Sequence, residues 1–112
     1  MKYMKKQIKI NTKLWLESEG KFVLGKGGAE LLRRIKKTGS LAEAARSMKM
    51  PYSHAWSSLR KISLAMGRPV VQTSRGGKPG GSTRLTKIGE ELLARFGEEM
   101  DAMEKHKAGR NR

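Results

Sequence analysis

The sequence contains no cysteine, which excludes disulfides, thiolate catalysis and cysteine-ligated zinc or iron centres. No apolar run approaches the roughly 20 residues of a membrane span. The lysine-rich start is followed by Gln7, Ile8 and Lys9 rather than by the apolar stretch of a signal peptide. We therefore expect no membrane partner and a cytoplasmic, nucleoid-associated location.

Acidic residues are also scarce, with 10 Asp and Glu against 25 Lys and Arg and a formal net charge of +15. The excess of basic residues is unevenly distributed along the chain. Residues 90–112 hold five basic and six acidic side chains, a net charge of −1, so residues 1–89 carry +16. A localised positive potential attracts polyanions, and the composition therefore predicts a nucleic-acid partner, with double-stranded DNA as the first candidate.

A chain of 112 residues is long enough for one domain with a small core. We expect a single α+β, mainly α domain over residues 1–104 and a flexible tail over residues 105–112. Short β-prone runs around Ser18, Glu19 and Gly20 predict an N-terminal β-hairpin over residues 13–24. The apolar spacing that follows predicts a first helix over residues 28–38.

Residues 40–66 have the pattern of a helix-turn-helix. Ser40 and Glu43 match a capping box, in which the hydroxyl and the carboxylate both bond backbone donors at a helix start. Pro51 interrupts the pattern, and an amphipathic stripe that begins at Ala55 then continues to Met66. An ordinary helical hairpin in an unrelated domain would give a similar pattern.

Residues 70–85 predict a second hairpin, whose β-prone arms flank a glycine-rich, basic tip. Such a loop cannot bury a core, but its glycines allow the backbone to approach a ligand closely. This hairpin is interpreted as the wing of a winged helix-turn-helix.

Residues 86–104 predict a long C-terminal helix that holds two subunits together, because its apolar stripe is longer than a small domain needs to cover itself. The outer half could instead dock on its own domain. The expected dimer-interface residues share this stripe: Leu92, Phe96, Met100 and Met103.

No pattern predicts an enzyme, a metal site or a cofactor. His54 and His106 lie far apart and have no partner at metal-ligand spacing. The glycines of residues 25–28 lack the last glycine of a dinucleotide fingerprint, since Glu30 stands there. The acidic residues of the last helix are more simply a solvated face than a catalytic pair.

Four stretches together resemble the N-terminal DNA-binding domain of the ModE molybdate-responsive regulators, which share a helix-turn-helix with the LysR type. They are Gly39-Ser40-Leu41-Ala42-Glu43-Ala44-Ala45-Arg46, Tyr52-Ser53-His54-Ala55-Trp56, Gly76-Gly77-Lys78-Pro79-Gly80-Gly81 and Leu85-Thr86-Lys87-Ile88-Gly89. The resemblance covers roughly residues 14–96. It implies a homodimer held by the terminal helix, a recognition helix in the major groove and a wing at the backbone or minor groove.

The chain departs from this family at two points. Pro51 stands where the family usually has a serine, and proline offers no side-chain cap to the recognition helix. The molybdate-binding domains of full-length members do not follow within these 112 residues. We therefore expect no small-molecule effector within this chain.

A recognition helix reads bases with side chains near its N-terminus, while basic groups around it hold phosphates. The expected base-facing residues are Tyr52, Ser53, His54 and Ser57. The expected phosphate and wing contacts are Arg46, Lys49, Arg60, Lys61, Arg75, Gly76, Gly77, Lys78 and Arg84. Trp56 is expected to pack on the wing rather than touch DNA.

The predicted function is thus a homodimeric DNA-binding transcriptional regulator. Three other readings remain open. A nonspecific architectural DNA-binding protein would explain the large positive charge. A basic RNA-binding protein is disfavoured because no aromatic RNP-type strand or KH-type Gly-X-X-Gly loop occurs. The third is an interaction module whose terminal helix recruits a partner protein.

Overall fold

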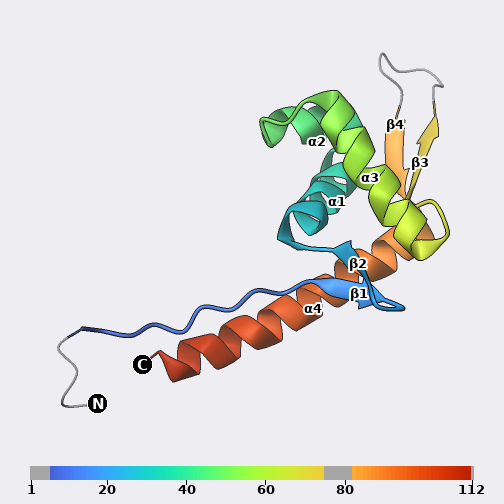
Figure 1. The fold of residues 1–112 in the computed structure, drawn as a ribbon. Helices are drawn as coiled ribbons and strands as arrows, with labels where there is room; N and C mark the ends of the chain where they lie inside the picture. The colour runs from blue at the N-terminus through green and yellow to red at the C-terminus, as the bar shows by residue number, and fades with distance from the viewer. Residues whose placement is uncertain (1–5, 75–81, 112) are drawn as a thin grey trace.

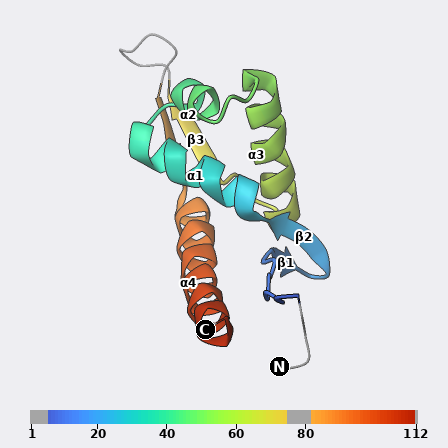
Figure 2. The ribbon, with the colours of Figure 1, turned by 90° about the vertical axis from the view of Figure 1, so that its left-hand side faces the viewer.

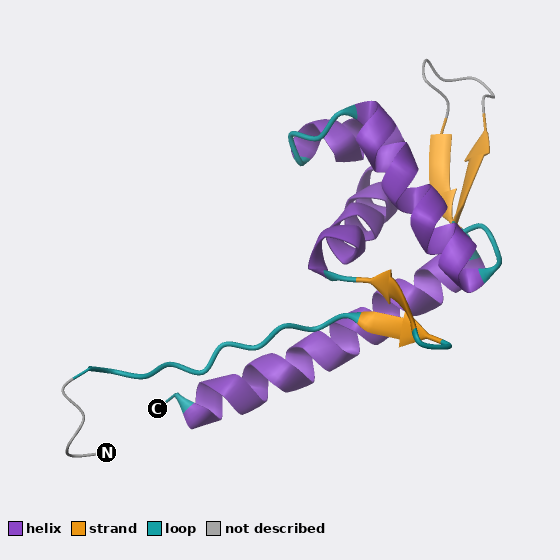
Figure 3. Ribbon diagram, in the orientation of Figure 1, coloured by secondary structure: helices purple, strands orange, loops and turns teal. Residues whose placement is uncertain are grey.

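The computed structural model describes residues 6–74 and 82–111, and in these ranges the chain has four helices and two two-stranded antiparallel sheets (Figures 1 and 3). In chain order they are β1 (Leu16–Ser18), β2 (Lys21–Leu24), α1 (Lys26–Thr38), α2 (Leu41–Ser47), α3 (Tyr52–Met66), β3 (Val71–Ser74), β4 (Ser82–Leu85) and α4 (Lys87–Arg110). The expected mainly helical α+β class is confirmed.

The core lies where α1, α2 and α3 pack together. Leu31, Leu32 and Ile35 form the apolar stripe of α1 and are completely buried. Ala44 and Ala45 of α2 are buried as well, and their small side chains allow the neighbouring helices to approach closely. The three helices therefore form one packed unit, from which α4 extends away in both views (Figures 1 and 2).

The first hairpin turns at Glu19 and Gly20, which both have positive φ angles, of 52° and 78°. The left-handed conformation is natural for glycine and explains the position of Gly20. Val23 and Leu24, the last two residues of β2, enter the core, whereas Phe22 stays exposed. The hairpin thus covers one side of the core with the end of β2.

The second hairpin is regular, with Val71 opposite Leu85 and Ser74 opposite Ser82. Its β4 strand is joined to the end of α1 by a hydrogen bond from the Thr83 N–H to the Gly39 carbonyl, of 2.9 Å. The tip of the hairpin, residues 75–81, lies outside the described residues.

Helix α4 begins at a side-chain cap and packs tightly at its start. The Thr86 hydroxyl accepts a hydrogen bond from the Gly89 N–H. Gly89 lies very close to Val70, the residue before β3. A Cβ atom built on Gly89 would be 2.2 Å from the Val70 carbonyl oxygen. Only a glycine fits this junction without movement of the backbone.

The flexible tail expected over residues 105–112 was a wrong prediction for residues 105–110, which continue α4 to Arg110. Two interactions favour the longer helix, one within α4 and one with the N-terminal segment. Lys107 pairs with Glu104 one turn earlier. The Asn111 side chain bonds both the N–H and the carbonyl of Ile10, at 3.0 and 3.2 Å, and so joins the end of α4 to the N-terminal segment that runs beside it (Figure 1).

Candidate nucleic-acid interface

A short connection joins α2 to α3 and sets the direction of α3. After Ser47 the chain turns through Lys49, a non-glycine residue with a left-handed φ of 54°. The Met50 N–H bonds the Ala45 carbonyl at 3.0 Å, which closes the end of α2. Pro51 then precedes α3 with φ −59° and ψ 143°, and it gives α3 no side-chain cap.

The start of α2 is capped differently from the expected capping box. The Ser40 hydroxyl accepts a hydrogen bond from the Glu43 N–H, as expected. The Ser40 N–H, however, bonds the Thr38 hydroxyl, and the Glu43 carboxylate pairs with Arg46 at 2.6 Å. Arg46 was expected to bind phosphate, and it is already held by a carboxylate one turn away.

The two sides of α3 differ sharply. Ala55, Leu59 and Ile62 are buried in the core. All four residues expected to face bases are exposed, and they occupy the first two turns: Tyr52, Ser53, His54 and Ser57. Burial of the opposite side therefore fixes which side chains α3 presents to a partner.

Two aromatic rings lie next to each other at the start of α3. Tyr52 is 50% exposed, and its ring meets that of Trp56 edge to face, with centroids 6.2 Å apart. Trp56 itself is half-buried and packs against the core. Trp56 thus joins the core to the Tyr52 ring, which remains accessible.

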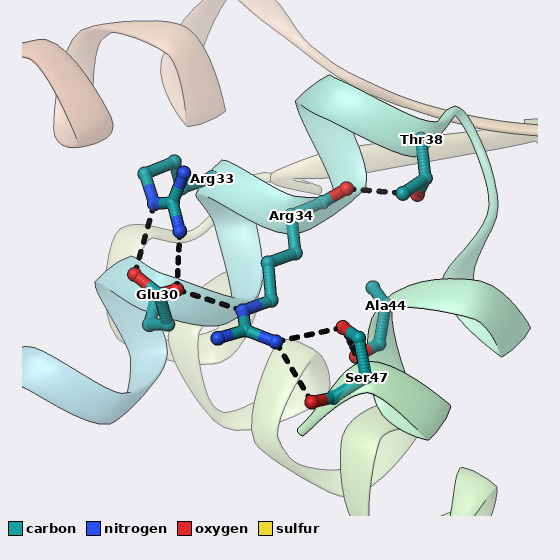
Figure 4. A network of polar contacts seen from close by, with 6 residues as sticks. All are labelled: Glu30, Arg33, Arg34, Thr38, Ala44 and Ser47. Carbon is teal, nitrogen blue, oxygen red and sulfur yellow. Dashed lines mark hydrogen bonds and ion pairs between the residues drawn. The ribbon is translucent and has the colours of Figure 1, made fainter. Parts of the chain in front are cut away.

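A polar network not foreseen from the sequence holds α1 against the end of α2 (Figure 4). The Arg34 guanidinium donates hydrogen bonds to the Ser47 carbonyl and hydroxyl, at 2.8 and 2.9 Å. The Glu30 carboxylate in turn accepts from Arg34 at 2.7 Å and from Arg33. We call Glu30, Arg34 and Ser47 the clamp, because they fix the connection that leads into α3.

The carboxylate of the clamp is held in its charged form. Hydrogen bonds from Arg33 and Arg34 lower the pKa of Glu30 from its ordinary 4.5 to about 2. The spacing of Glu30 and Arg34, four residues apart on a helix, was a signal for this pair in the sequence. No local pattern could have identified Ser47 as the third member, because it belongs to another helix.

The charge around α3 is of one sign. Between residues 44 and 89 the sequence contains nine Lys and Arg and no Asp or Glu. Lys49, Arg60, Lys61 and Arg84 belong to this stretch and are all exposed. Lys49, Arg60 and Lys61 extend along α3 and its approach, and Arg84 lies on the neighbouring hairpin, opposite Gln72.

The remaining expected wing contacts, Arg75, Gly76, Gly77 and Lys78, lie outside the described residues. The arms from which this tip extends stand beside α3 (Figure 1). Trp56 and Leu59 of α3 and Val71 of β3 line one common groove, so the helix and the hairpin form neighbouring parts of one surface.

The four residues expected at a dimer interface have different surroundings. Phe96 is only 5% exposed and belongs to the core of its own chain, so it is not available to a second subunit, contrary to the prediction from the sequence. Leu92 and Met100 are half-buried against that core. Met103 lies further out on α4 and is also half-buried.

Two further features of the described residues bear on the kind of site. No group of three or more His, Asp or Glu side chains within residues 6–74 and 82–111 could hold a metal ion. In the same ranges no helix is both long and apolar enough to cross a membrane.

The chain matches no protein-family model. It is 41% identical over 73 residues to the molybdenum-pterin-binding protein MopB of Rhodobacter capsulatus, a match that covers 62% of this chain and 27% of MopB. It is 40% identical over 63 residues to the transcriptional regulator ModE of Haemophilus influenzae, covering 56% of this chain and 25% of that protein.

A third relative is the DNA-binding transcriptional dual regulator ModE of Escherichia coli, 30% identical over 63 residues, or 56% of this chain and 24% of that protein. Each match thus spans about a quarter of the relative's length. The chain is therefore similar, over more than half of its residues, to part of the ModE regulators and of a Mop protein.

Proposed function

We propose that this chain is a DNA-binding transcriptional regulator of the winged helix-turn-helix type, with α3 as its recognition helix. The observation that carries the proposal is the surface around α3. The only side of α3 that is not buried presents Tyr52, Ser53, His54 and Ser57, and it lies in a stretch of 46 residues, 44 to 89, without a single acidic residue. Such a surface fits a phosphate backbone with base edges between the phosphates.

The start of α3 suits this role in a second way. It has no side-chain cap and no acidic residue in its first turn. The N–H groups at the start of a helix and the positive end of its dipole can together bind a phosphate. A carboxylate in the first turn would weaken that binding, and the first turn of α3 contains none. The name of the Escherichia coli relative, a DNA-binding regulator, supports the same conclusion.

The clamp and the hairpin have supporting roles in this proposal. The clamp fixes the connection before α3, so that the helix meets DNA at a defined angle. Arg84, together with Arg75 and Lys78 of the tip, would hold phosphates beside the recognition helix.

The degree of sequence selectivity is a separate question, and one observation favours a nonspecific architectural role as the second candidate. None of the four exposed side chains at the start of α3 is an arginine, lysine, asparagine or glutamine, the residues that make bidentate contacts with bases. Selectivity would then rest on tyrosine and serine contacts and on DNA shape.

One experiment distinguishes the two candidates. The purified protein is bound to genomic DNA fragments at physiological salt, with bulk DNA as competitor, and the retained fragments are sequenced. Enrichment of a common site supports the regulator. Tight binding without enrichment supports the architectural protein, and absence of duplex binding contradicts both.

We further propose a homodimer formed through the outer part of α4. The helix extends well beyond the three packed helices, and the radius of gyration of 17.4 Å exceeds the roughly 13 Å of a compact domain of this length. Met100 and Met103 are the apolar contacts expected there. Sedimentation across a range of protein concentrations tests this, and a monomer at all concentrations would contradict it. A dimer predicts a palindromic site in the selected DNA.

A further inference from the structure

A groove lies beside the C-terminal half of α3, at the point where this helix meets β3. Its volume is about 460 Å³. Its apolar lining comes from three elements: Trp56, Leu59 and Leu64 of α3, Pro69 of the connection and Val71 of β3. Leu64 is 75% exposed, and together with the apolar floor it forms a continuous apolar surface of the kind that marks interaction sites.

The rim of the groove is basic. Arg60 and Arg68 both line it, and none of the residues that line it is acidic. Among residues 6–74 and 82–111, neither arginine forms an ion pair with a carboxylate. The groove therefore combines an apolar floor with two unused guanidinium groups, which favours a partner that is both apolar and acidic.

We propose that this groove binds an acidic amphipathic helix of another protein, whose leucine or phenylalanine side chains fill the apolar floor and whose carboxylates pair with Arg60 and Arg68. Short helices that lie in an apolar groove with anchors on one face are a common form of peptide recognition. The nine Lys and Arg of residues 44–89 extend the attraction for an acidic partner beyond the rim.

Two other occupants fit less well. In a symmetric contact between two copies of this chain, Arg60 and Arg68 would face the same two arginines, and like charges oppose such a contact. DNA would pair with the arginines but would leave Leu64, Pro69 and Val71 against a polar backbone. Leu64 also lies roughly three turns along α3 from Tyr52, at the opposite end from the proposed base-reading residues.

The position of the groove would allow a partner and DNA to bind the same helix at different ends. The docking surface goes beyond the proposed function, since it concerns a protein partner rather than DNA. Arg60 is common to the two surfaces, and for this reason the test leaves it unchanged.

The test uses a fluorescein-labelled synthetic helical peptide about four turns long, with leucine and phenylalanine on one face and glutamate on the other. Fluorescence anisotropy measures its binding to the full chain without DNA, so that failure of the DNA-binding proposal would not affect the result. We expect micromolar affinity and a loss of at least about tenfold in Leu64→Glu and in Arg68→Glu.

Both substituted side chains are exposed, and circular dichroism checks that the variants stay folded. Ile8→Glu is the matched control, because Ile8 is another exposed apolar residue, 67% accessible, that does not line the groove. Its affinity for the peptide should equal that of the unchanged chain. A second peptide with lysine in place of glutamate should bind far more weakly.

Three results would overturn the proposal. One is equal affinity of the peptide for the unchanged chain and for both variants. Another is equal binding of the acidic and the basic peptide. The third is self-association of the unchanged chain that Leu64→Glu abolishes while the acidic peptide does not bind, which would assign the groove to a second copy.

Discussion

The region of residues 44–89 and helix α4 differ in nearly every property that determines how a protein surface is used. The first contains nine basic residues and no acidic one, and its helix α3 is buried on one side by the core. Helix α4 is mixed in sign; it packs against the core as far as Met100, and its C-terminal part projects beyond the core. The difference fits the division of roles proposed above, with DNA at the positively charged surface around α3 and a second subunit at the outer part of α4.

The two regions meet at Gly89, and the largest effect is expected there. A methyl group in Gly89→Ala would collide with the Val70 carbonyl, since its Cβ would be 2.2 Å from that oxygen. We expect a loss of about 3 kcal/mol in the free energy of unfolding, because backbone on both sides must move. Urea denaturation measures it.

Gly97→Ala is the control within the same helix, since nothing lies within 4 Å of a Cβ at that position. This change should stabilise the protein by up to about 1 kcal/mol, the usual gain for alanine over glycine in a helix. Equal effects of the two substitutions would show that α4 does not pack tightly against the residue before β3.

The charge difference between the regions is tested by neutralising three basic residues in each. Replacement of Arg60, Lys61 and Arg84 by alanine should lower the slope of log affinity against log salt by about 2.7, because each phosphate contact on duplex DNA contributes about 0.9. Binding titrations at several salt concentrations give the slope.

The matched variant replaces Arg95, Lys105 and Arg110 of α4 and removes the same total charge. Its slope should be that of the unchanged chain. If both variants lower the slope equally, the net charge of the molecule rather than the surface around α3 determines DNA binding.

A smaller effect is expected from the clamp. Arg34→Ala removes both hydrogen bonds to Ser47, whereas Arg33→Ala leaves them intact because Arg33 bonds Glu30 and not Ser47. We expect Arg34→Ala to lower the free energy of unfolding by about 1 kcal/mol more than Arg33→Ala. It should also weaken DNA binding roughly fivefold, because a looser connection lowers the fraction of molecules with α3 correctly placed. Equal DNA affinities of the two variants would contradict this role.

The smallest expected effect is a pH dependence of the same cluster. The pKa of Glu30 is lowered from 4.5 to about 2 in the folded protein, so its ion pairs stabilise the fold above pH 4.5, and this stabilisation is lost as the pH falls towards 2. The difference in unfolding free energy between the unchanged chain and Glu30→Gln should be below about 1 kcal/mol at neutral pH, since the group is partly exposed. It should shrink between pH 4.5 and 2 in denaturation curves. A difference independent of pH would exclude the ion pairs as its source.

The sequence predicted the local features better than the contacts between distant segments. The apolar spacing from Ala55 and the cap at Ser40 are local patterns, and the structure has α3 and α2 at those residues. The burial of Phe96 in its own core could not be foreseen, since the stripe of α4 does not show which of its residues meet the other helices. The same holds for the clamp and for the bonds between Asn111 and Ile10, which join residues 101 positions apart.

The left-handed backbone of Lys49 implies a compromise between the stability of the fold and the binding of a polyanion. A side chain in this conformation costs on the order of 1 kcal/mol relative to glycine. Glycine would end α2 with less strain, but it would remove a cation from the turn that leads directly into α3. The chain thus keeps a strained backbone at Lys49 and retains a positive charge close to any polyanion that approaches the start of α3.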